Sequence, residues 1–188
     1  GKYDPRKSKG DIRPEHNGNS YIDLVIDDIS DKLVPYAHNI LQINEGNHET
    51  SVSSRLETNV LQRLVERINT KAGSNIQLGA YVGMIILEIT SKTNPTRLSY
   101  KIAYSHGHWG GGVSKGTSAT MKYGQMFPDA DLVCSGHTHD QWHMVISRYK
   151  YNPNKQKLEI KNQDHIKTGT YKEEFEKGSG WAVEKLAM

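Results

Sequence analysis

Apolar residues recur at helical spacing in two segments near the start of the chain. The spacing predicts a first helix from Ser20, an N-cap residue, to Pro35, with this apolar face: Leu24, Ile26, Ile29, Leu33 and Val34. It predicts a second helix that begins at Ser51 or Ser53 and carries this stripe: Leu56, Val60, Leu61, Leu64, Val65 and Ile68. Between them, the apolar run at 39–44 predicts a short buried strand.

The pattern changes from helical to extended after the second helix. Runs rich in β-branched and aromatic residues predict strands at these positions: 76–80, 81–90, 97–104, 131–134, 142–151, 157–160 and 166–171. A further short helix opens at Ser114 or Thr117 and reaches Phe127. The Asn-Pro-Asn turn at 152–154 joins two of the strands into a hairpin.

These elements predict one α+β domain over 1–188. Residues 1–19 show no apolar period and predict a loop, while 172–188 predict a polar tail. The order of helices and strands fits an α/β sandwich, in which two mixed β-sheets pack face to face and are flanked by helices. A chain of 188 residues can bury one such core.

Composition narrows the class of protein. The net charge of +3 is too small to indicate nucleic-acid binding. The excess of basic over acidic residues lies in one N-terminal cluster, of a kind typical of a solvated tail: Lys2, Arg6, Lys7, Lys9 and Arg13. Cys134 is the single cysteine, which excludes an internal disulfide and fits a reducing compartment. No apolar run approaches the about 20 residues that cross a bilayer. We therefore expect a cytoplasmic protein that does not enter a membrane.

Three loops that each follow a predicted strand carry the reactive side chains. They are Asn44-Glu45-Gly46-Asn47-His48-Glu49, Tyr104-Ser105-His106-Gly107-His108-Trp109 and Ser135-Gly136-His137-Thr138-His139-Asp140. If the strands share one sheet, these loops converge at one of its edges, where open α/β sheets place their ligands. The three loops are therefore the predicted functional site.

The two later loops each hold two histidines separated by one residue. In an extended backbone, residues i and i+2 point to the same side, so His137 and His139 can address one metal cluster, as can His106 and His108. Neutral imidazole suits zinc, iron, nickel and manganese. The pairing of histidines indicates a metal site.

The first loop offers different chemistry. Asn47 supplies a neutral oxygen ligand, and His48 supplies an imidazole that can donate a proton to a leaving alkoxide. Glu49 has two alternative roles: it orients the His48 ring, or it is a helix N-terminal charge that faces the macrodipole. Two metal ions about 3.5–4 Å apart can clamp both oxygens of a phosphoryl displacement and hold a hydroxide at neutral pH.

Together, these stretches resemble the calcineurin-like metallophosphoesterases, and most closely the phage and bacterial enzymes of that family. The motifs that carry the resemblance are Gly46-Asn47-His48-Glu49, the histidines of 106–108, and Gly136-His137-Thr138-His139. They stand in the family's order, and the resemblance covers residues 20–171. The fold it implies is a sandwich of two mixed sheets flanked by helices.

The resemblance also implies a role for each matched residue. The implied metal ligands are Asn47, His106 and His137 for one ion and His139 for the other. His48 matches the proposed general acid, which also contacts the phosphate, and Asn47 and His108 are further substrate contacts. His108 is also an alternative ligand to His106. Two divalent transition-metal ions are implied, with manganese preferred and iron, zinc or nickel as alternatives.

The chain departs from the family pattern in one respect. The family has two earlier blocks, Asp-x-His and Gly-Asp-x-x-Asp, which supply the bridging aspartate and most ligands of one metal. No Asp-x-His occurs in the sequence, and Gly10-Asp11-Ile12-Arg13-Pro14 ends in proline where the second block has aspartate. The chain is therefore expected to be a fragment without its N-terminal blocks.

The predicted activity is metal-dependent hydrolysis of phosphomonoesters or phosphodiesters by a hydroxide that two metal ions activate. One alternative is a DNA or RNA nuclease of the same family, which the basic start of the chain, Arg148 and Lys150 favour. A second is a non-catalytic binding module that keeps the fold. Trp109 and Trp142 either line the mouth of the site or pack in the core, and the turn at 168–171 is predicted to face the substrate. The oligomeric state stays open.

Overall fold

A computed structural model describes residues 13–18, 20–93, 97–107 and 117–169, together with Gly178 and Val183. The contacts within the chain divide it into two compact units, Gly1–Tyr81 and Val82–Met188, called unit 1 and unit 2 below. Each unit is described by itself. The prediction of a single domain stays a prediction.

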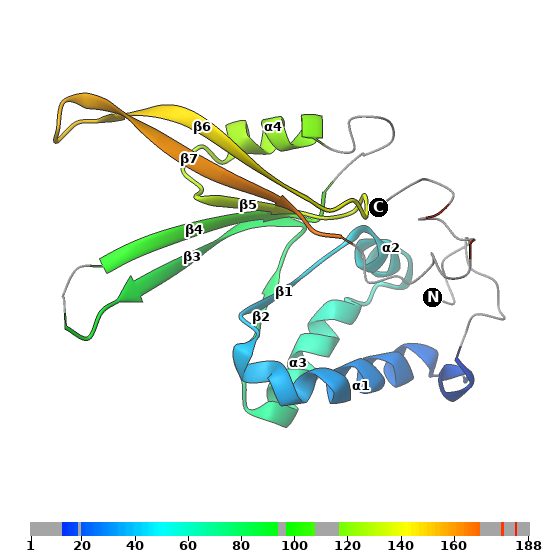
Figure 1. Cartoon of the computed structure of the whole chain (residues 1–188). Helices are drawn as coiled ribbons and strands as arrows, with labels where there is room; N and C mark the ends of the chain where they lie inside the picture. The colour runs from blue at the N-terminus through cyan, green and yellow to red at the C-terminus, as the bar shows by residue number, and fades with distance from the viewer. Residues whose placement is uncertain are drawn as a thin grey trace. The chain divides into compact units, whose positions relative to one another are not determined.

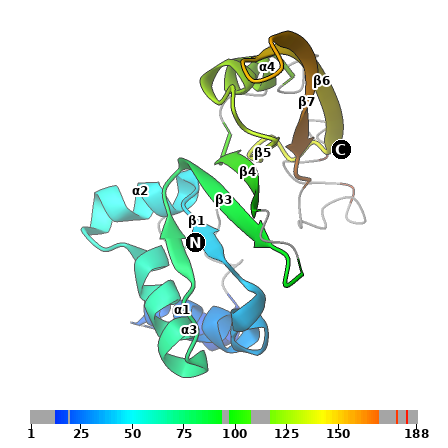
Figure 2. The same ribbon diagram turned by 90° about the vertical axis from the view of Figure 1, so that its left-hand side faces the viewer.

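Unit 1 consists of helices and a small parallel sheet. Its elements are the short 3-10 helices η2 (Pro14–His16) and η3 (Val34–Asn39), the helices α1 (Tyr21–Leu33), α2 (Asn47–Leu56) and α3 (Val60–Ala72), and the strands β1 (Gln42–Asn44) and β2 (Gln77–Gly79). The two strands pair in parallel, with Gln42 opposite Gln77. Figures 1 and 2 both show α1 and α3 side by side.

The first predicted helix is confirmed, but the predicted start of the second helix is wrong. Ser20 stands at the N-cap of α1, although its side chain makes no capping hydrogen bond. The predicted helix from Ser51 or Ser53 is two helices, because Glu57 takes a left-handed φ of 51° and ends α2. Asn59 then caps α3 by accepting hydrogen bonds from two backbone N–H groups. The predicted strand at 39–44 is shortened to β1.

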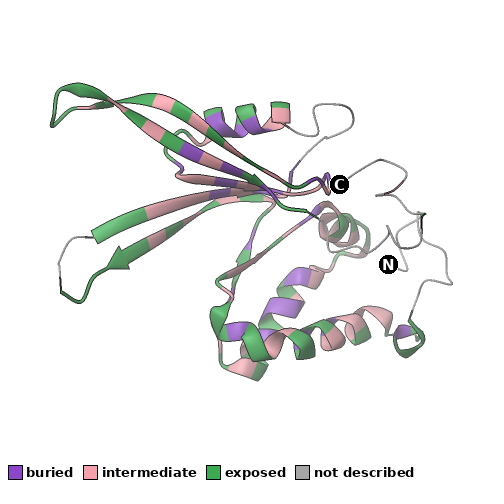
Figure 3. Ribbon diagram, in the orientation of Figure 1, coloured by how far each residue is buried: buried purple, intermediate pink, exposed green. Residues whose placement is uncertain are grey.

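The core of unit 1 lies along one face of α3. The buried residues of that helix are Leu61, Leu64, Val65 and Ile68. Figure 3 shows buried positions along α3. These residues pack with Ile26 of α1, Ala37 and Ile76. Complete burial of one such aliphatic side chain contributes about 1.5–3 kcal/mol, so the predicted apolar stripe is the main stabilising feature of this unit.

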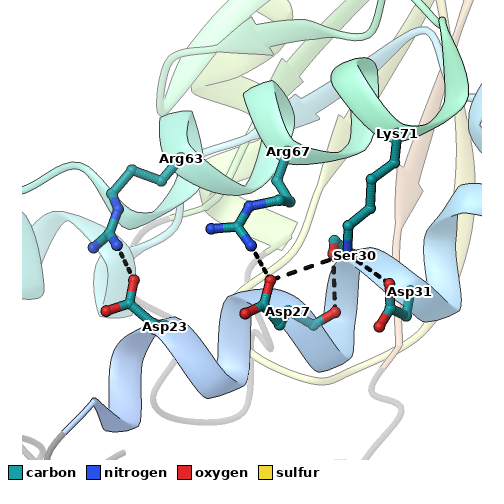
Figure 4. A network of polar contacts seen from close by, with 7 residues as sticks. All are labelled: Asp23, Asp27, Ser30, Asp31, Arg63, Arg67 and Lys71. Atoms are coloured by element: carbon teal, nitrogen blue, oxygen red, sulfur yellow. Dashed lines mark hydrogen bonds and ion pairs between the residues drawn. The ribbon is translucent and has the colours of Figure 1, made fainter.

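Ion pairs join the outer edges of α1 and α3 (Figure 4). Acidic residues one turn apart on α1 meet basic residues one turn apart on α3 in three pairs: Asp23 with Arg63, Asp27 with Arg67, and Asp31 with Lys71. Lys71 also donates to the buried hydroxyl of Ser30, at 3.0 Å. Pairs this exposed contribute only about 0.2–1 kcal/mol each. Their regular spacing therefore sets the alignment of the two helices more than it stabilises them.

Unit 2 is built on a five-stranded mixed sheet with the strand order β3-β4-β5-β7-β6. Its elements are β3 (Val82–Thr90), β4 (Arg97–Ser105), α4 (Thr117–Met126), β5 (Leu132–Ser135), β6 (Trp142–Asn152) and β7 (Lys157–Lys167). The outer pairs β3–β4 and β6–β7 are antiparallel hairpins, while β5 runs parallel to both of its neighbours.

The predicted strands of unit 2 are confirmed, with one correction. The hairpin around 152–154 forms as predicted, but 157–160 and 166–171 are not separate strands. A single strand, β7, runs from Lys157 to Lys167, because β6 pairs with it along its whole length. The polar residues of 161–165, which looked like a break in the sequence, lie within this strand and include the buried Gln163 and His165.

A buried polar network holds the C-terminal end of α4 to the sheet. The amide of Gln163 donates to the carbonyl oxygens of Phe127 and Ala130, at 2.9 and 2.8 Å. Arg148 donates to the carbonyl oxygen of Gly124 at 3.0 Å and also to the Gln163 side chain. His165 Nε2 lies 3.0 Å from the same Gln163 oxygen. The side chains of β6 and β7 thus pair with the carbonyl of Gly124 in the last turn of α4 and with two carbonyls just after the helix, those of Phe127 and Ala130.

This network predicts that unit 2 loses stability in mild acid. Burial, assisted by the charge of Arg148 and opposed by that of Asp164, lowers the pKa of His165 below its ordinary value of 6.5. Below pH 6.5 the unfolded chain therefore binds a proton that the folded protein resists, so the free energy of unfolding falls as the pH decreases. Urea unfolding of the wild type across this range should show the loss, and His165→Gln should flatten the profile. A profile equally steep in the variant would contradict this cause.

The observed fold is mixed α+β, with a five-stranded mixed sheet, a two-stranded sheet and helices. This agrees with the predicted fold class at that level. In the part of the chain that the structure describes, no helix combines the length and the apolar character needed to span a bilayer.

Candidate metal centre

Two neighbouring parallel strands bring two histidine loops of unit 2 together. β4 ends at Ser105 and β5 at Ser135, and these two residues are opposite each other in the register. His106 and Gly136, the next residue on each strand, are joined by a hydrogen bond from Gly136 N to His106 O of 3.2 Å. The carboxyl ends of the strands thus place the second and third predicted loops at one edge of the sheet.

The rings of His106 and His137 lie against each other at this edge. His106 Nε2 is 3.2 Å from His137 Nδ1, and the ring planes are inclined by 72°. Two nitrogens that bind one ion at about 2.0–2.1 Å, with octahedral or tetrahedral angles, lie about 2.8–3.4 Å apart. The two nitrogens lie within hydrogen-bond distance of each other, and the same separation is compatible with two ligands of one metal ion. The family resemblance implied these two histidines, with Asn47, as ligands of one ion.

A glycine lets the two loops approach this closely. Gly107 has φ of 99°, a conformation that side-chain-bearing residues rarely adopt. A methyl group at Gly107 would lie 2.5 Å from the carbonyl oxygen of Gly136. Its backbone N–H donates to the hydroxyl of Ser105 at 3.1 Å, and that hydroxyl contacts the hydroxyl of Tyr123 on α4. The position of the His106 loop thus depends on the absence of a side chain at 107.

The third loop has an unusual backbone. His137 and His139 have φ values of 76° and 64°, in the left-handed region that non-glycine residues seldom occupy. The argument that an extended backbone turns both rings to the same side is therefore wrong for this loop. Left-handed non-glycine residues cost about 1–3 kcal/mol each and cluster at functional sites. Two in three residues indicate that the loop is shaped for its histidines rather than for stability.

Two substitutions at His139 should separate the effect of the ring on stability from the effect of the strained backbone. His139→Gly removes the ring and relieves the left-handed strain, whereas His139→Ala removes the ring and keeps the strain. In the absence of metal, the glycine variant should have a free energy of unfolding about 1 kcal/mol higher than the alanine variant. Urea unfolding measures the difference. Equal stabilities would show that the loop does not hold His139 in this conformation in solution.

A buried lysine beside the third loop was not found by the sequence analysis. Lys167 is only 1% exposed and lies opposite Ser135 on one side and Trp142 on the other. Burial lowers its pKa, while the negative charge of the buried Asp140 acts in the opposite direction. The signal for Lys167 was its position at the end of a strand, directly before Thr168-Gly169.

The end of β7 supports the third loop and borders a hollow. Thr168 donates from its backbone and its hydroxyl to the carbonyl oxygen of Ser135, at 2.8 and 3.3 Å. A hollow of about 500 Å³ is lined by Gln141, Trp142, His143 and the residues Ile166 to Gly169. Trp142 therefore lines a surface hollow, and its predicted place at the mouth of the site stays a prediction. Thr168 and Gly169, predicted to face the substrate, border the same hollow.

The first predicted loop belongs to unit 1. Its residues Asn47, His48 and Glu49 form the first turn of α2, not a loop before a later helix. The Glu49 carboxylate accepts a hydrogen bond from Gly46 N at 3.0 Å, which confirms its role at the helix N-terminus. Asn47 is half-buried and His48 is exposed. Their roles as ligand and general acid stay predictions.

Other predicted residues lie outside the described ranges. These are His108, Trp109, Asp11 and the basic cluster before Arg13. His139 is half-buried in its loop, and its role as ligand of a second ion stays a prediction. Among the described residues, no group of three or more histidine, cysteine, aspartate or glutamate side chains is arranged to hold a metal ion. The candidate donor set among the described residues is the pair His106 and His137.

The chain was compared with known proteins at three levels. No protein-family model matches it, and no curated protein and no solved structure was found to be similar.

Proposed function

We propose that this protein is a metal-dependent phosphoesterase. The observation that carries the proposal is the 3.2 Å separation of His106 Nε2 and His137 Nδ1 at the carboxyl ends of two parallel strands. The motifs around these histidines, which resemble those of the calcineurin-like metallophosphoesterases, support the same reaction. The strained backbone of His137 and His139 supports a loop selected for binding.

His106 and His137 would hold a divalent transition metal, for which imidazole nitrogen is a suitable donor. A bound ion of this kind stabilises the charge that develops on a phosphoryl group and makes water a stronger nucleophile at neutral pH. The chain's own contribution is to fix the two rings. Gly107 permits the approach of the loops, and Thr168 and Ser105 hold the loop ends through hydrogen bonds. His48 is proposed as the proton donor and Asn47 as a further ligand, on the resemblance alone.

Metal analysis followed by two model substrates tests the proposal. The purified protein, loaded with Mn²⁺ and desalted, should retain the metal, and it should hydrolyse p-nitrophenyl phosphate or bis-p-nitrophenyl phosphate only after loading. The preferred substrate separates monoesterase from diesterase activity. A protein that retains Mn²⁺ but hydrolyses neither substrate would favour the non-catalytic binding module. A protein that retains no metal would overturn the proposal.

A further inference from the structure

A chain of two buried hydrogen bonds joins helix α4 to the loop that carries His106. The backbone N–H of Gly107 donates to the hydroxyl of Ser105 at 3.1 Å, and this hydroxyl donates to the hydroxyl oxygen of Tyr123 on α4 at 3.2 Å. Ser105 is 7% exposed, Tyr123 is 9% exposed and Gly107 is buried. Because water does not compete for these groups, the two bonds can fix the positions of the atoms that they join.

These bonds hold the backbone on both sides of His106. Ser105 precedes His106 and Gly107 follows it, so the bond from Gly107 to the serine hydroxyl closes a tight turn around this histidine. The carbonyl oxygen of His106 also accepts a hydrogen bond from the backbone N–H of Gly136, at 3.2 Å. The direction of the His106 ring therefore depends on how firmly the serine hydroxyl is held.

The hydroxyl of Tyr123 has a role that core packing does not require. A phenylalanine at this position would make the same apolar contacts with the core residues Ala103, Ala130 and Val133. A serine hydroxyl can occupy three staggered positions about its Cα–Cβ bond, and a partner on its far side selects one of them. The Tyr123 hydroxyl is that partner for Ser105.

Tyr123 is itself anchored by the sheet of unit 2, beside which Figure 1 shows α4. The carbonyl oxygen of Gly124, next to Tyr123 in the helix, accepts a hydrogen bond from Arg148 of β6 at 3.0 Å. The backbone N–H of Phe127 donates to the carbonyl oxygen of Tyr123 at 2.9 Å, and Gln163 of β7 donates to the carbonyl oxygen of Phe127 at 2.9 Å. The sheet therefore holds the phenol at a fixed position, from which it can direct the serine hydroxyl.

We propose that Tyr123 is a positioning residue of the metal centre, which holds the His106 ring against His137 through this chain of hydrogen bonds. Its part is to set the position of a ligand, not to bind the metal or the substrate. The inference rests on the proposed metal site at His106 and His137. Residues that orient a metal ligand typically contribute about 10–100-fold to metal affinity, because ligands must be held within about 0.5 Å of their productive geometry.

Titration of the full chain with Mn²⁺ tests the proposal by removing one oxygen atom. Tyr123→Phe should lower the affinity about tenfold, and Ser105→Ala, which removes both hydrogen bonds, should lower it about 10–100-fold. The double variant should bind like Ser105→Ala alone, because the two residues act in one chain. Ser147→Ala is the matched control, since it removes a serine hydroxyl of the same sheet that donates to Asn162 at 2.8 Å. It should leave the affinity unchanged.

A spectroscopic measurement separates positioning from a general loss of stability. Co²⁺ bound in place of Mn²⁺ absorbs visible light in bands that depend on the geometry of its ligands. Tyr123→Phe should shift these bands in the folded protein, whereas Ser147→Ala should leave them in place. A purely structural role of the hydroxyl would lower the free energy of unfolding without moving the bands.

The outcomes distinguish this inference from the proposed function. A wild type that retains no Mn²⁺ overturns both. A wild type that binds Mn²⁺, together with a Tyr123→Phe variant that matches it in affinity and in its Co²⁺ bands, overturns the positioning role alone. A variant that binds more weakly with unmoved bands also overturns that role, because its defect would be one of stability.

Discussion

Replacing His137 with alanine should remove metal binding and, with it, phosphoester hydrolysis. His137 Nδ1 is one of the two nitrogens that meet at the edge of the sheet, 3.2 Å from His106 Nε2. Loss of a group that only supports a ligand lowers metal affinity about 10–100-fold, so the loss of a direct ligand should exceed about 100-fold. Isothermal titration with Mn²⁺ measures the affinity, and a p-nitrophenyl ester assay measures the rate.

Two further variants make this result specific. His106→Ala should have the same effect as His137→Ala, and the double variant should be no worse than either, because residues that act as a unit are not additive. His38→Ala, at an exposed histidine of unit 1, is the matched control and should leave affinity and rate unchanged. If His137→Ala retained wild-type affinity for Mn²⁺, the pair of imidazoles would not be the metal site.

A methyl group at Gly107 should strongly destabilise unit 2. Gly107→Ala combines a left-handed φ of 99° with a Cβ only 2.5 Å from the Gly136 carbonyl oxygen. The conformational cost of about 1–2 kcal/mol adds to the clash with backbone, so a loss of about 3 kcal/mol or more is expected. Relief of the clash must move the loops apart, so Mn²⁺ affinity should fall as well. Urea unfolding and titration measure the two effects.

Gly73→Ala separates the two causes. Gly73, at the end of α3, has φ of 63°, but a Cβ there would meet nothing within 4 Å. The Gly73→Ala variant should lose only the conformational part of the free energy of unfolding, about 1 kcal/mol. Its affinity for Mn²⁺ should be unchanged. Hydrogen exchange of the amides in α3 and β4 reports the stability of each unit by itself. Equal losses in the two variants would mean that the loops at Gly107 and Gly136 are not in close contact.

Local patterns of the sequence were sufficient to predict most of the helices and strands. The apolar stripe of α3 predicted its buried face, and the runs rich in β-branched and aromatic residues on both sides of the turn at 152–154 predicted the hairpin of β6 and β7. These features depend on the period of the backbone, which neighbouring residues determine. The same reasoning missed the break at Glu57, because a left-handed residue outside glycine leaves little trace in composition. It also divided β7, because the buried Gln163 and His165 are polar.

The sequence by itself determined which residues are the candidates for a metal site: two histidine-bearing loops after strands, with His106 and His137 among them. Only the tertiary structure decided that these two rings meet. The contact depends on the parallel pairing of β4 with β5, on the room at Gly107, and on left-handed backbone at His137 and His139. The burial of Lys167 beside the same loop was also decided there. The physical reason is that strand order and loop conformation arise from contacts between residues about 30 positions apart, such as His106 and His137.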